Sequence, residues 1–199
     1  MRRTALALIP YAAMAAAVAC GYLWYLGDRA AGLVPVEAGR AVPIGGPFRL
    51  IDQYGRAVHD SDFRGRFMLV YFGYTNCPDV CPTTLATIAK AMDELGPEAA
   101  RIAPLFVTVD PARDTPKALR DYLSAFGPRF IGLTGSPAAV GKVAREYRVF
   151  FRKEPGAPGS YAVDHSSTIY LMGPGGVFVT NYDESVGPDG LARDLRKRL

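Results

Sequence analysis

The distribution of apolar residues divides the chain into an apolar N-terminus, a short linker and a globular part. Thr4 to Leu26 is a run of 23 residues without a charge, long enough as a helix to cross a hydrocarbon core of about 30 Å. Residues 30–44 contain glycine, proline and small side chains without periodicity, which is typical of a linker. The pattern therefore predicts an anchor over residues 1–29, a linker over 30–44 and one domain over 45–199.

Within the globular part, the spacing of apolar residues alternates between strand and helix periods. Two continuous apolar runs, Phe67–Phe72 and Leu105–Val109, predict strands that are covered on both faces. Apolar residues at helical spacing from Leu85 to Leu95 predict a helix between them. Further strands are expected near 48–51, 130–133, 149–151, 168–172 and 177–180, further helices over 115–126, 136–147 and 191–199, and an exposed loop over 152–160.

This order of elements predicts an α/β fold with a mixed sheet. The unit from Phe67 to Val109 should be a parallel, right-handed βαβ unit. The last strands should form a hairpin around Gly173–Gly176, followed by a terminal helix. The order matches a thioredoxin-like mixed sheet flanked by helices, and the N-terminal run adds one transmembrane helix in front of it.

The flanks of the apolar run predict its orientation in a membrane. Arg2 and Arg3 precede it, and Tyr22, Trp24 and Tyr25 crowd its other end like an interfacial aromatic belt. The positive-inside bias then places the domain on the outer side of the membrane. A cleaved signal peptide and a lipoprotein signal ending at Cys20 are the alternatives. The length of the run and its apolar continuation past Cys20 favour an uncleaved anchor, with Cys20 inside the span.

Composition and charge narrow the function classes. The formal net charge is +4, and the basic residues are scattered, so the basic stripe that nucleic acid requires is missing from the sequence. There are three cysteines, and only two lie outside the apolar N-terminus, so the chain is not a disulfide-dense scaffold. A close cysteine pair points to redox or metal chemistry.

That pair is Cys77 and Cys81, at the end of a predicted buried strand and the start of a predicted helix. Residues four apart share a face of a helix, so both sulfurs can point to one place. Amide N–H groups at the helix start favour a thiolate over a thiol. Two converging thiolates suit a soft metal ion such as Cu(I), or a reversible disulfide.

The chain has two histidines, His59 and His165. His59 lies in a polar loop, where a surface role is expected. His165 precedes the first strand of the predicted hairpin, in the segment that faces the cysteine turn of a thioredoxin-like fold and normally holds a cis-proline, so we expect it to be a metal ligand. Asp164 is expected either to orient the imidazole or to act as a turn residue.

Three motifs together resemble the Sco/SenC family, whose members are membrane-anchored, copper-binding proteins with a thioredoxin-like fold. They are Cys-Pro-Asp-Val-Cys-Pro (77–82), Thr-Val-Asp-Pro-Ala-Arg-Asp-Thr-Pro (108–116) and Val-Asp-His-Ser (163–166), in the family's order. The resemblance covers about residues 45–199 and implies that Cys77, Cys81 and His165 bind copper, as Cu(I), Cu(II) or both. Asp110 and Asp114 belong to the second motif. Structural roles at the end of a strand and at a helix cap explain these two residues as well as the family resemblance does.

The resemblance also implies a function and a place. The protein would be a copper chaperone rather than an enzyme, taking copper from a donor protein and delivering it to the dinuclear copper site of cytochrome c oxidase. It would sit in the bacterial cytoplasmic membrane with its C-terminal domain in the periplasm, or in the mitochondrial inner membrane facing the intermembrane space. Its partners would be the copper-bearing oxidase subunit, the copper donor and the membrane.

The residues themselves leave other functions open. The cysteine pair could act as a thiol–disulfide oxidoreductase that reduces the cysteines of the oxidase copper site, a role that does not need His165. The chain could also be a sensor in which the copper or redox state of the pair changes its contact with a membrane partner, although the sequence supplies no output domain. Finally, Cys77 and Cys81 could form a static disulfide, which would bind no metal.

Overall fold

The computed structural model describes residues 18, 20–22, 43–156 and 160–199. Its globular unit is Pro43–Leu199, and the division into an anchor, a linker and a domain stays a prediction. Most of the predicted anchor and linker lies outside the described residues. Within the described residues, no helix combines the length and the apolar character that a membrane crossing requires, so the predicted transmembrane helix stays a prediction.

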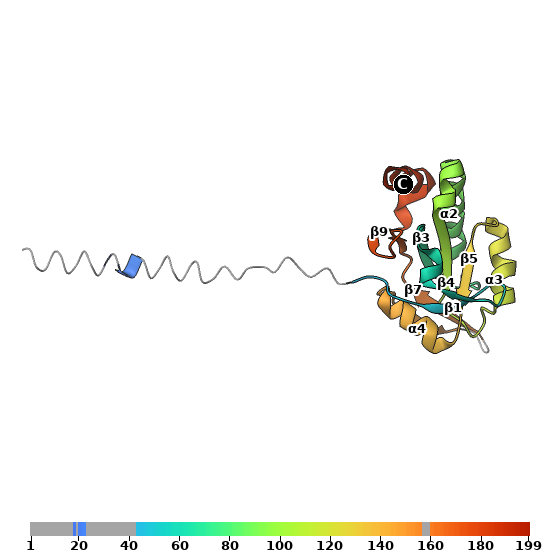
Figure 1. The fold of residues 1–199 in the computed structure, drawn as a ribbon. Helices are drawn as coiled ribbons and strands as arrows, with labels where there is room; N and C mark the ends of the chain where they lie inside the picture. Colours follow the sequence, from blue (N-terminus) through green and yellow to red (C-terminus); the bar gives the residue numbers. More distant parts are fainter. Residues whose placement is uncertain (1–17, 19, 23–42, 157–159) are drawn as a thin grey trace, which may run out of the picture. The chain divides into compact units, whose positions relative to one another are not determined.

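The globular unit alternates strands and helices along the chain (Figure 1). Short 3-10 turns cover 60–63, 96–101, 124–126 and 184–186. The main elements are β1 (Arg49–Asp52), β2 (Ala57–His59), β3 (Phe67–Gly73), α2 (Val80–Leu95), β4 (Ile102–Thr108), α3 (Pro116–Leu123), β5 (Ile131–Thr134), α4 (Pro137–Glu146), β6 (Phe151–Pro155), β7 (Tyr161–His165), β8 (Ile169–Met172), β9 (Phe178–Tyr182) and α5 (Gly187–Arg198).

Seven of the strands form one mixed sheet in the order β2-β1-β5-β4-β3-β8-β9. The pairs β3–β4 and β4–β5 are parallel, and the remaining pairs are antiparallel. The predicted βαβ unit is therefore present as β3-α2-β4, and the predicted terminal hairpin as β8–β9. The mixed sheet with flanking helices confirms the predicted α/β class.

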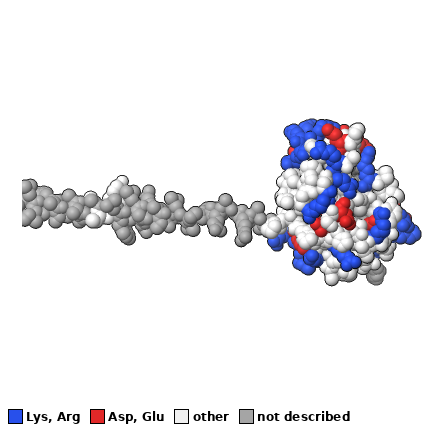
Figure 2. All heavy atoms as spheres, viewed as in Figure 1, with Lys and Arg blue, Asp and Glu red and all other residues white. Residues whose placement is uncertain are grey.

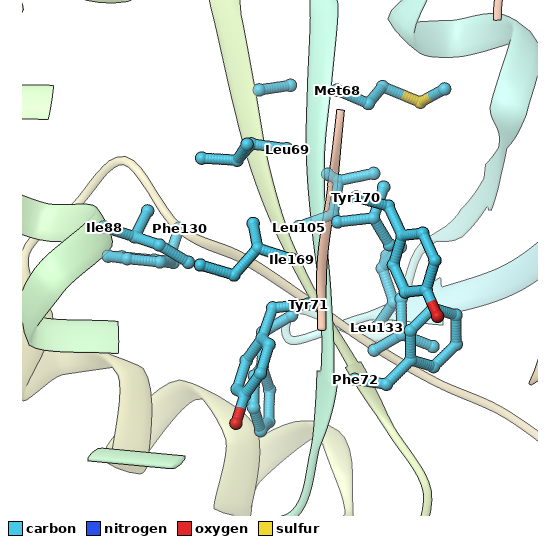
Figure 3. Packing of buried hydrophobic residues seen from close by; sticks show 14 of the residues in the cluster. Met68, Leu69, Tyr71, Phe72, Ile88, Leu105, Phe130, Leu133, Ile169 and Tyr170 are labelled. Carbon is cyan, nitrogen blue, oxygen red and sulfur yellow. The ribbon is translucent and has the colours of Figure 1, made fainter. Parts of the chain in front are cut away.

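The central strand β3 is buried along its whole length because helices cover both faces of the sheet. Successive residues of a strand point to opposite faces. On one face, Tyr71 packs near Phe106, which contacts Tyr122 of α3. On the other face, Phe72 packs against Tyr147, at the end of α4. Figure 3 shows Tyr71 and Phe72 on opposite sides of the strand.

The sequence prediction was wrong for the segment after α4. Residues 152–155, expected in an exposed loop, form β6, which pairs with β7 as a two-stranded sheet of its own. The strand expected at 149–151 begins only at Phe151. Most side chains of β6 and β7 are at least partly exposed, so the apolar alternation that marks a half-buried strand is missing from the sequence.

Basic side chains do not form a continuous stripe on the visible face of the globular unit. Figure 2 shows Lys and Arg gathered over the end of the unit where α5 lies, with acidic residues among them. In that region Arg198 pairs with Asp194, and Arg196 pairs with Glu98.

Candidate metal centre

The two cysteines lie at the junction of β3 and α2. Cys77 is in the turn after β3 and is partly buried, whereas Cys81 is the second residue of α2 and is completely buried. The backbone N–H of Cys77 donates to the Tyr74 carbonyl at 3.2 Å and closes the turn. The backbone N–H of Cys81 donates to Cys77 Sγ at 3.4 Å. An amide at the helix start thus points at a sulfur, as the sequence predicted.

His165 is the last residue of β7 and reaches the same place from a different part of the chain. Its Nε2 lies 3.3 Å from Cys81 Sγ, and its Nδ1 lies 3.0 Å from the Ser166 carbonyl oxygen. Since a carbonyl only accepts hydrogen bonds, Nδ1 carries the proton in this geometry. Nε2 then presents its lone pair to the sulfur side, which is the tautomer that a metal ligand needs.

Two aromatic rings hold the imidazole between them. The ring of Tyr74 meets His165 edge-on at 5.7 Å between centroids, and the ring of Tyr71 does so at 6.4 Å. Edge-to-face contacts of this kind favour one ring orientation. The imidazole is therefore fixed both by the Ser166 carbonyl and by its aromatic neighbours.

The structure brings Cys77, Cys81 and His165 into one cluster, as the sequence predicted. Their ligand atoms all lie within 4.8 Å of one another. Two sulfurs and one imidazole nitrogen form a soft donor set that suits Cu(I). Structural zinc sites almost always have four protein ligands, and among the described residues three such groups converge here. The role of these residues as ligands stays a prediction.

Burial controls the protonation of the inner cysteine. The buried surroundings of Cys81 disfavour a thiolate and raise the pKa of its thiol to about 12. The neighbouring Tyr71 hydroxyl is also buried, and burial together with the Cys81 sulfur raises the pKa of that phenol. Without a metal, Cys81 is therefore a protonated thiol at neutral pH. A metal ion must displace that proton in order to bind.

His59 and Asp164, the other two residues that the sequence analysis considered for the site, lie outside the cluster. His59 is exposed and lies at the start of the 60–63 turn, in the surface position expected of it. Asp164 is exposed on β7, opposite Arg152 of β6. Because neighbouring residues of a strand point to opposite faces, Asp164 does not orient the imidazole, and the Ser166 carbonyl takes that role.

Sequence reasoning named Asp110 and Asp114 but missed the side chains that they hold. Asp110 and Asp114 are fully buried and hold other segments in place, while Thr115 caps α3. Tyr161 and Arg113 contact Asp110. The available signal was the pair of acidic residues directly after a buried strand, since such carboxylates need partners when they are buried.

Comparison with known proteins agrees with this geometry. The model of the SCO1/SenC family matches residues 36–199. "Protein SCO1 homolog 1, mitochondrial" from Arabidopsis thaliana is 41% identical over 166 residues, which are 81% of this chain and 49% of the plant protein. The chain thus spans about half the length of this curated relative, and 54% of the mitochondrial SCO1 protein of Saccharomyces cerevisiae.

Solved structures extend the likeness to the fold. The copper-bound structure of ScoI from Bradyrhizobium japonicum is 45% identical, with a TM-score of 0.75, over 78% of this chain and 99% of that one. The structure of BsSco, in which a disulfide switch was identified, is 25% identical with a TM-score of 0.62, over 79% and 94% of the two chains. BsSco is described as a member of the Sco family of cytochrome c oxidase assembly proteins. These likenesses confirm the thioredoxin-like fold that the sequence predicted.

Proposed function

The chain belongs to the SCO1/SenC family, and from this premise we propose that it is a copper chaperone for cytochrome c oxidase. In this proposal Cys77, Cys81 and His165 bind one copper ion. The protein receives the ion from a donor protein and delivers it to the oxidase subunit that carries the dinuclear copper site. The observation that carries the proposal is the convergence of two sulfurs and one imidazole nitrogen within 4.8 Å.

The chemistry of the donor set supports copper as the cargo. Thiolates favour soft metal ions such as Cu(I), and imidazole is also a good ligand for copper. The Bradyrhizobium relative carries copper in its solved structure. In this chain, the Nδ1–H of His165 is held by the Ser166 carbonyl, which leaves Nε2 free to bind the ion together with both sulfurs.

The exposure of the ligands supports transfer rather than permanent storage. Cys81 is completely buried, whereas Cys77 and His165 are only partly buried. Three protein ligands leave room for a ligand of the partner to bind before one of them leaves. The outer residues Cys77 and His165 would then release the ion first, and Cys81 last.

The place of action follows from the N-terminal run. We propose that residues 1–29 anchor the protein in the bacterial cytoplasmic membrane, or in the mitochondrial inner membrane of a eukaryote. Arg2 and Arg3 would stay on the inner side. The domain would then face the periplasm or the intermembrane space, where the copper-bearing domain of the oxidase subunit is also expected.

Copper affinity should increase with pH because a proton competes with copper for the Cys81 sulfur. The pKa of Cys81 is raised to about 12, so the thiol is fully protonated between about pH 6 and pH 8. Each pH unit should then strengthen Cu(I) binding about tenfold for the one proton that Cys81 releases. Competition titrations with a Cu(I) chelator at three pH values measure the slope, and a pH-independent affinity would contradict the assignment of Cys81 as a ligand.

Copper transfer tests the proposed function directly. The full chain, purified with detergent and loaded with one equivalent of Cu(I), is mixed with the reduced, copper-free domain of the oxidase subunit. We expect copper to move to that domain.

The variant His165→Ala should bind Cu(I) about a hundredfold more weakly, as the loss of one ligand costs a few kcal/mol. His59→Ala, the matched control at the exposed histidine, should behave as the wild type, and equal binding by both variants would refute the ligand set.

A second candidate function is thiol–disulfide exchange with the same oxidase subunit. It is favoured by the placement of the pair, because Cys77 is partly exposed and its Sγ lies within 4.8 Å of that of Cys81. In this reaction the Cys77 thiolate attacks a disulfide of the partner, and Cys81 then resolves the mixed disulfide, so that the pair is oxidised and the partner reduced. Reduction of the partner at an unchanged rate by His165→Ala would favour this function over copper delivery.

A further inference from the structure

The small β6–β7 sheet carries His165, yet its backbone pairs with no strand of the main sheet. A two-stranded ribbon is marginally stable by itself and needs packing against other elements. Its place relative to the cysteines must therefore be set by side-chain contacts. The loop between β4 and α3 supplies such contacts through two carboxylates, Asp110 and Asp114, which are both 0% exposed.

Asp114 holds the cysteine turn. Its Oδ2 accepts a hydrogen bond from the backbone N–H of Thr75 at 3.1 Å, and its Oδ1 accepts one from the Thr75 hydroxyl at 2.6 Å. The Thr108 hydroxyl at the end of β4 donates to Oδ2 at 2.6 Å. Thr75 lies two residues before Cys77. Asp114 therefore ties the turn that carries Cys77 to the end of β4.

Asp110 holds the β6–β7 sheet from the same loop. The hydroxyl of Tyr161, the first residue of β7, donates to Asp110 at 2.8 Å to Oδ1 and 3.1 Å to Oδ2. Arg113 pairs with Asp110 through Nε and donates from Nη1 to the Tyr161 carbonyl at 2.9 Å. Its guanidinium also lies 3.7 Å from the Tyr161 ring centroid. Three contacts thus fix one end of the strand whose other end is His165.

Tyr74 lies next to His165 and contacts both the β6–β7 sheet and the cysteine turn. Its ring lies 5.7 Å from the guanidinium carbon of Arg113. Its hydroxyl accepts a hydrogen bond from the backbone N–H of Val163 at 3.3 Å, in the middle of β7. Its carbonyl accepts from Cys77, and its ring edge packs against His165. The contacts therefore run without a break from the β4–α3 loop to both halves of the cluster.

We propose that the β4–α3 loop is a positioning bracket for the copper site. Asp110 and Arg113, acting through Tyr161, set where His165 lies, and Asp114, acting through Thr75, sets where the cysteine turn lies. None of these residues binds the metal ion. The inference rests on the proposed function, because it takes Cys77, Cys81 and His165 as the copper ligands.

If the β4–α3 loop is such a bracket, changes at Tyr161 should affect copper binding through His165, and changes at Thr75 should affect it through the cysteine turn. Tyr161→Phe removes the hydroxyl that bonds to Asp110 but keeps the ring under Arg113. In the full chain we expect it to weaken Cu(I) binding about tenfold, since partners behind a metal ligand are typically worth 10- to 100-fold in affinity. In a His165→Ala background the same change should have less than about a twofold effect, because its target is gone. Thr75→Val should weaken binding in both backgrounds.

Chelator competition with Cu(I) measures these affinities, and the nitrogen coupling in the electron paramagnetic resonance spectrum of the Cu(II) form reports His165 directly. Tyr161→Phe should reduce that coupling, which a purely structural role would not change. Arg113→Lys keeps the positive charge but cannot bond to both Asp110 and the Tyr161 carbonyl. It should therefore weaken Cu(I) binding and reduce the nitrogen coupling as Tyr161→Phe does. Tyr182→Phe is the matched control, since its hydroxyl bonds to Asp194 and joins β9 to α5; it should change neither quantity.

The outcomes separate the bracket from the copper site. If His165→Ala weakens Cu(I) binding but Tyr161→Phe has no effect, or has the same effect with and without His165, the bracket is wrong and the copper site stands. If His165→Ala binds Cu(I) like the wild type, the ligand set is wrong and the bracket falls with it. A tenfold loss that vanishes in the His165→Ala background supports both.

Discussion

Cys81→Ser is expected to weaken Cu(I) binding by about a thousandfold. Structural zinc sites built from cysteine and histidine bind with roughly 10–16 kcal/mol in total, so that one ligand of such a site is worth about 3–5 kcal/mol, and we expect a similar loss here. A serine hydroxyl is a hard donor and is not ionised at neutral pH, so it cannot replace a thiolate for Cu(I). Chelator competition on the full chain measures the loss.

The third cysteine provides the matched control for this change. Cys20 belongs to the N-terminal apolar run and not to the globular unit that carries the cluster, so Cys20→Ser should leave the affinity unchanged. Circular dichroism checks that Cys81→Ser, which places a hydroxyl at a fully buried position, still folds. A folded Cys81→Ser protein whose Cu(I) affinity stays within tenfold of the wild type would refute the role of Cys81.

Gly73→Ala is expected to disturb both the fold and the copper site. A Cβ atom at Gly73 would lie 2.8 Å from Cys81 Sγ and 2.8 Å from Cε2 of Phe106. Phe106 and Cys81 are both completely buried, so neither can move aside easily. Overpacking of this kind costs about 1–3 kcal/mol of the free energy of unfolding. Displacement of the Cys81 sulfur should also weaken Cu(I) binding by about tenfold, the lower end of effects seen behind metal ligands.

Denaturant unfolding and chelator competition measure the two effects of Gly73→Ala. The backbone of Gly73 is not in the left-handed region, so the cost comes from the added methyl group and not from backbone strain. Gly175→Ala is the matched control, because an added Cβ there meets nothing within 4 Å. If Gly73→Ala unfolds at the wild-type denaturant concentration and binds Cu(I) as tightly, the close packing around Cys81 has been misjudged.

The buried half of the fold could be predicted from the sequence because its periodicity is strong. β3 and β4 are buried at every position, and they appear in the sequence as continuous apolar runs. The helix that follows the cysteine turn carries its apolar residues on one face. Thr115 and Ser136 accept the hydrogen bonds expected of helix caps.

The exposed hairpin could not be predicted in the same way. β6 reads Phe-Arg-Lys-Glu-Pro, a run of charged residues that gives no apolar alternation. Its strand character comes from backbone pairing with β7, and the hairpin contacts the β4–α3 loop through Lys153 of β6 and Tyr161 of β7. Such contacts join residues about 50 positions apart, as between Asp110 and Tyr161, and no local pattern encodes them.

The same reason limits what the sequence said about the site. The spacing of Cys77 and Cys81 is local, and a turn followed by a helix start is enough to bring the amide of Cys81 to the sulfur of Cys77. The approach of His165 to Cys81, 84 residues away, followed only from the expected fold. The sequence left two roles open for Asp164, and both are wrong. The residue lies inside β7 and not in a turn, and the alternation of that strand turns its side chain away from His165.

The central claim is that one copper ion is bound by two cysteine sulfurs and one histidine nitrogen of a single chain. X-ray absorption at the copper edge of the Cu(I)-loaded full chain tests this claim most directly, because it counts the sulfur and nitrogen neighbours of the metal. We predict two sulfurs and one nitrogen per copper, with the nitrogen lost in His165→Ala. A site with sulfur neighbours alone, or one in which His165→Ala leaves the nitrogen in place, would contradict the claim.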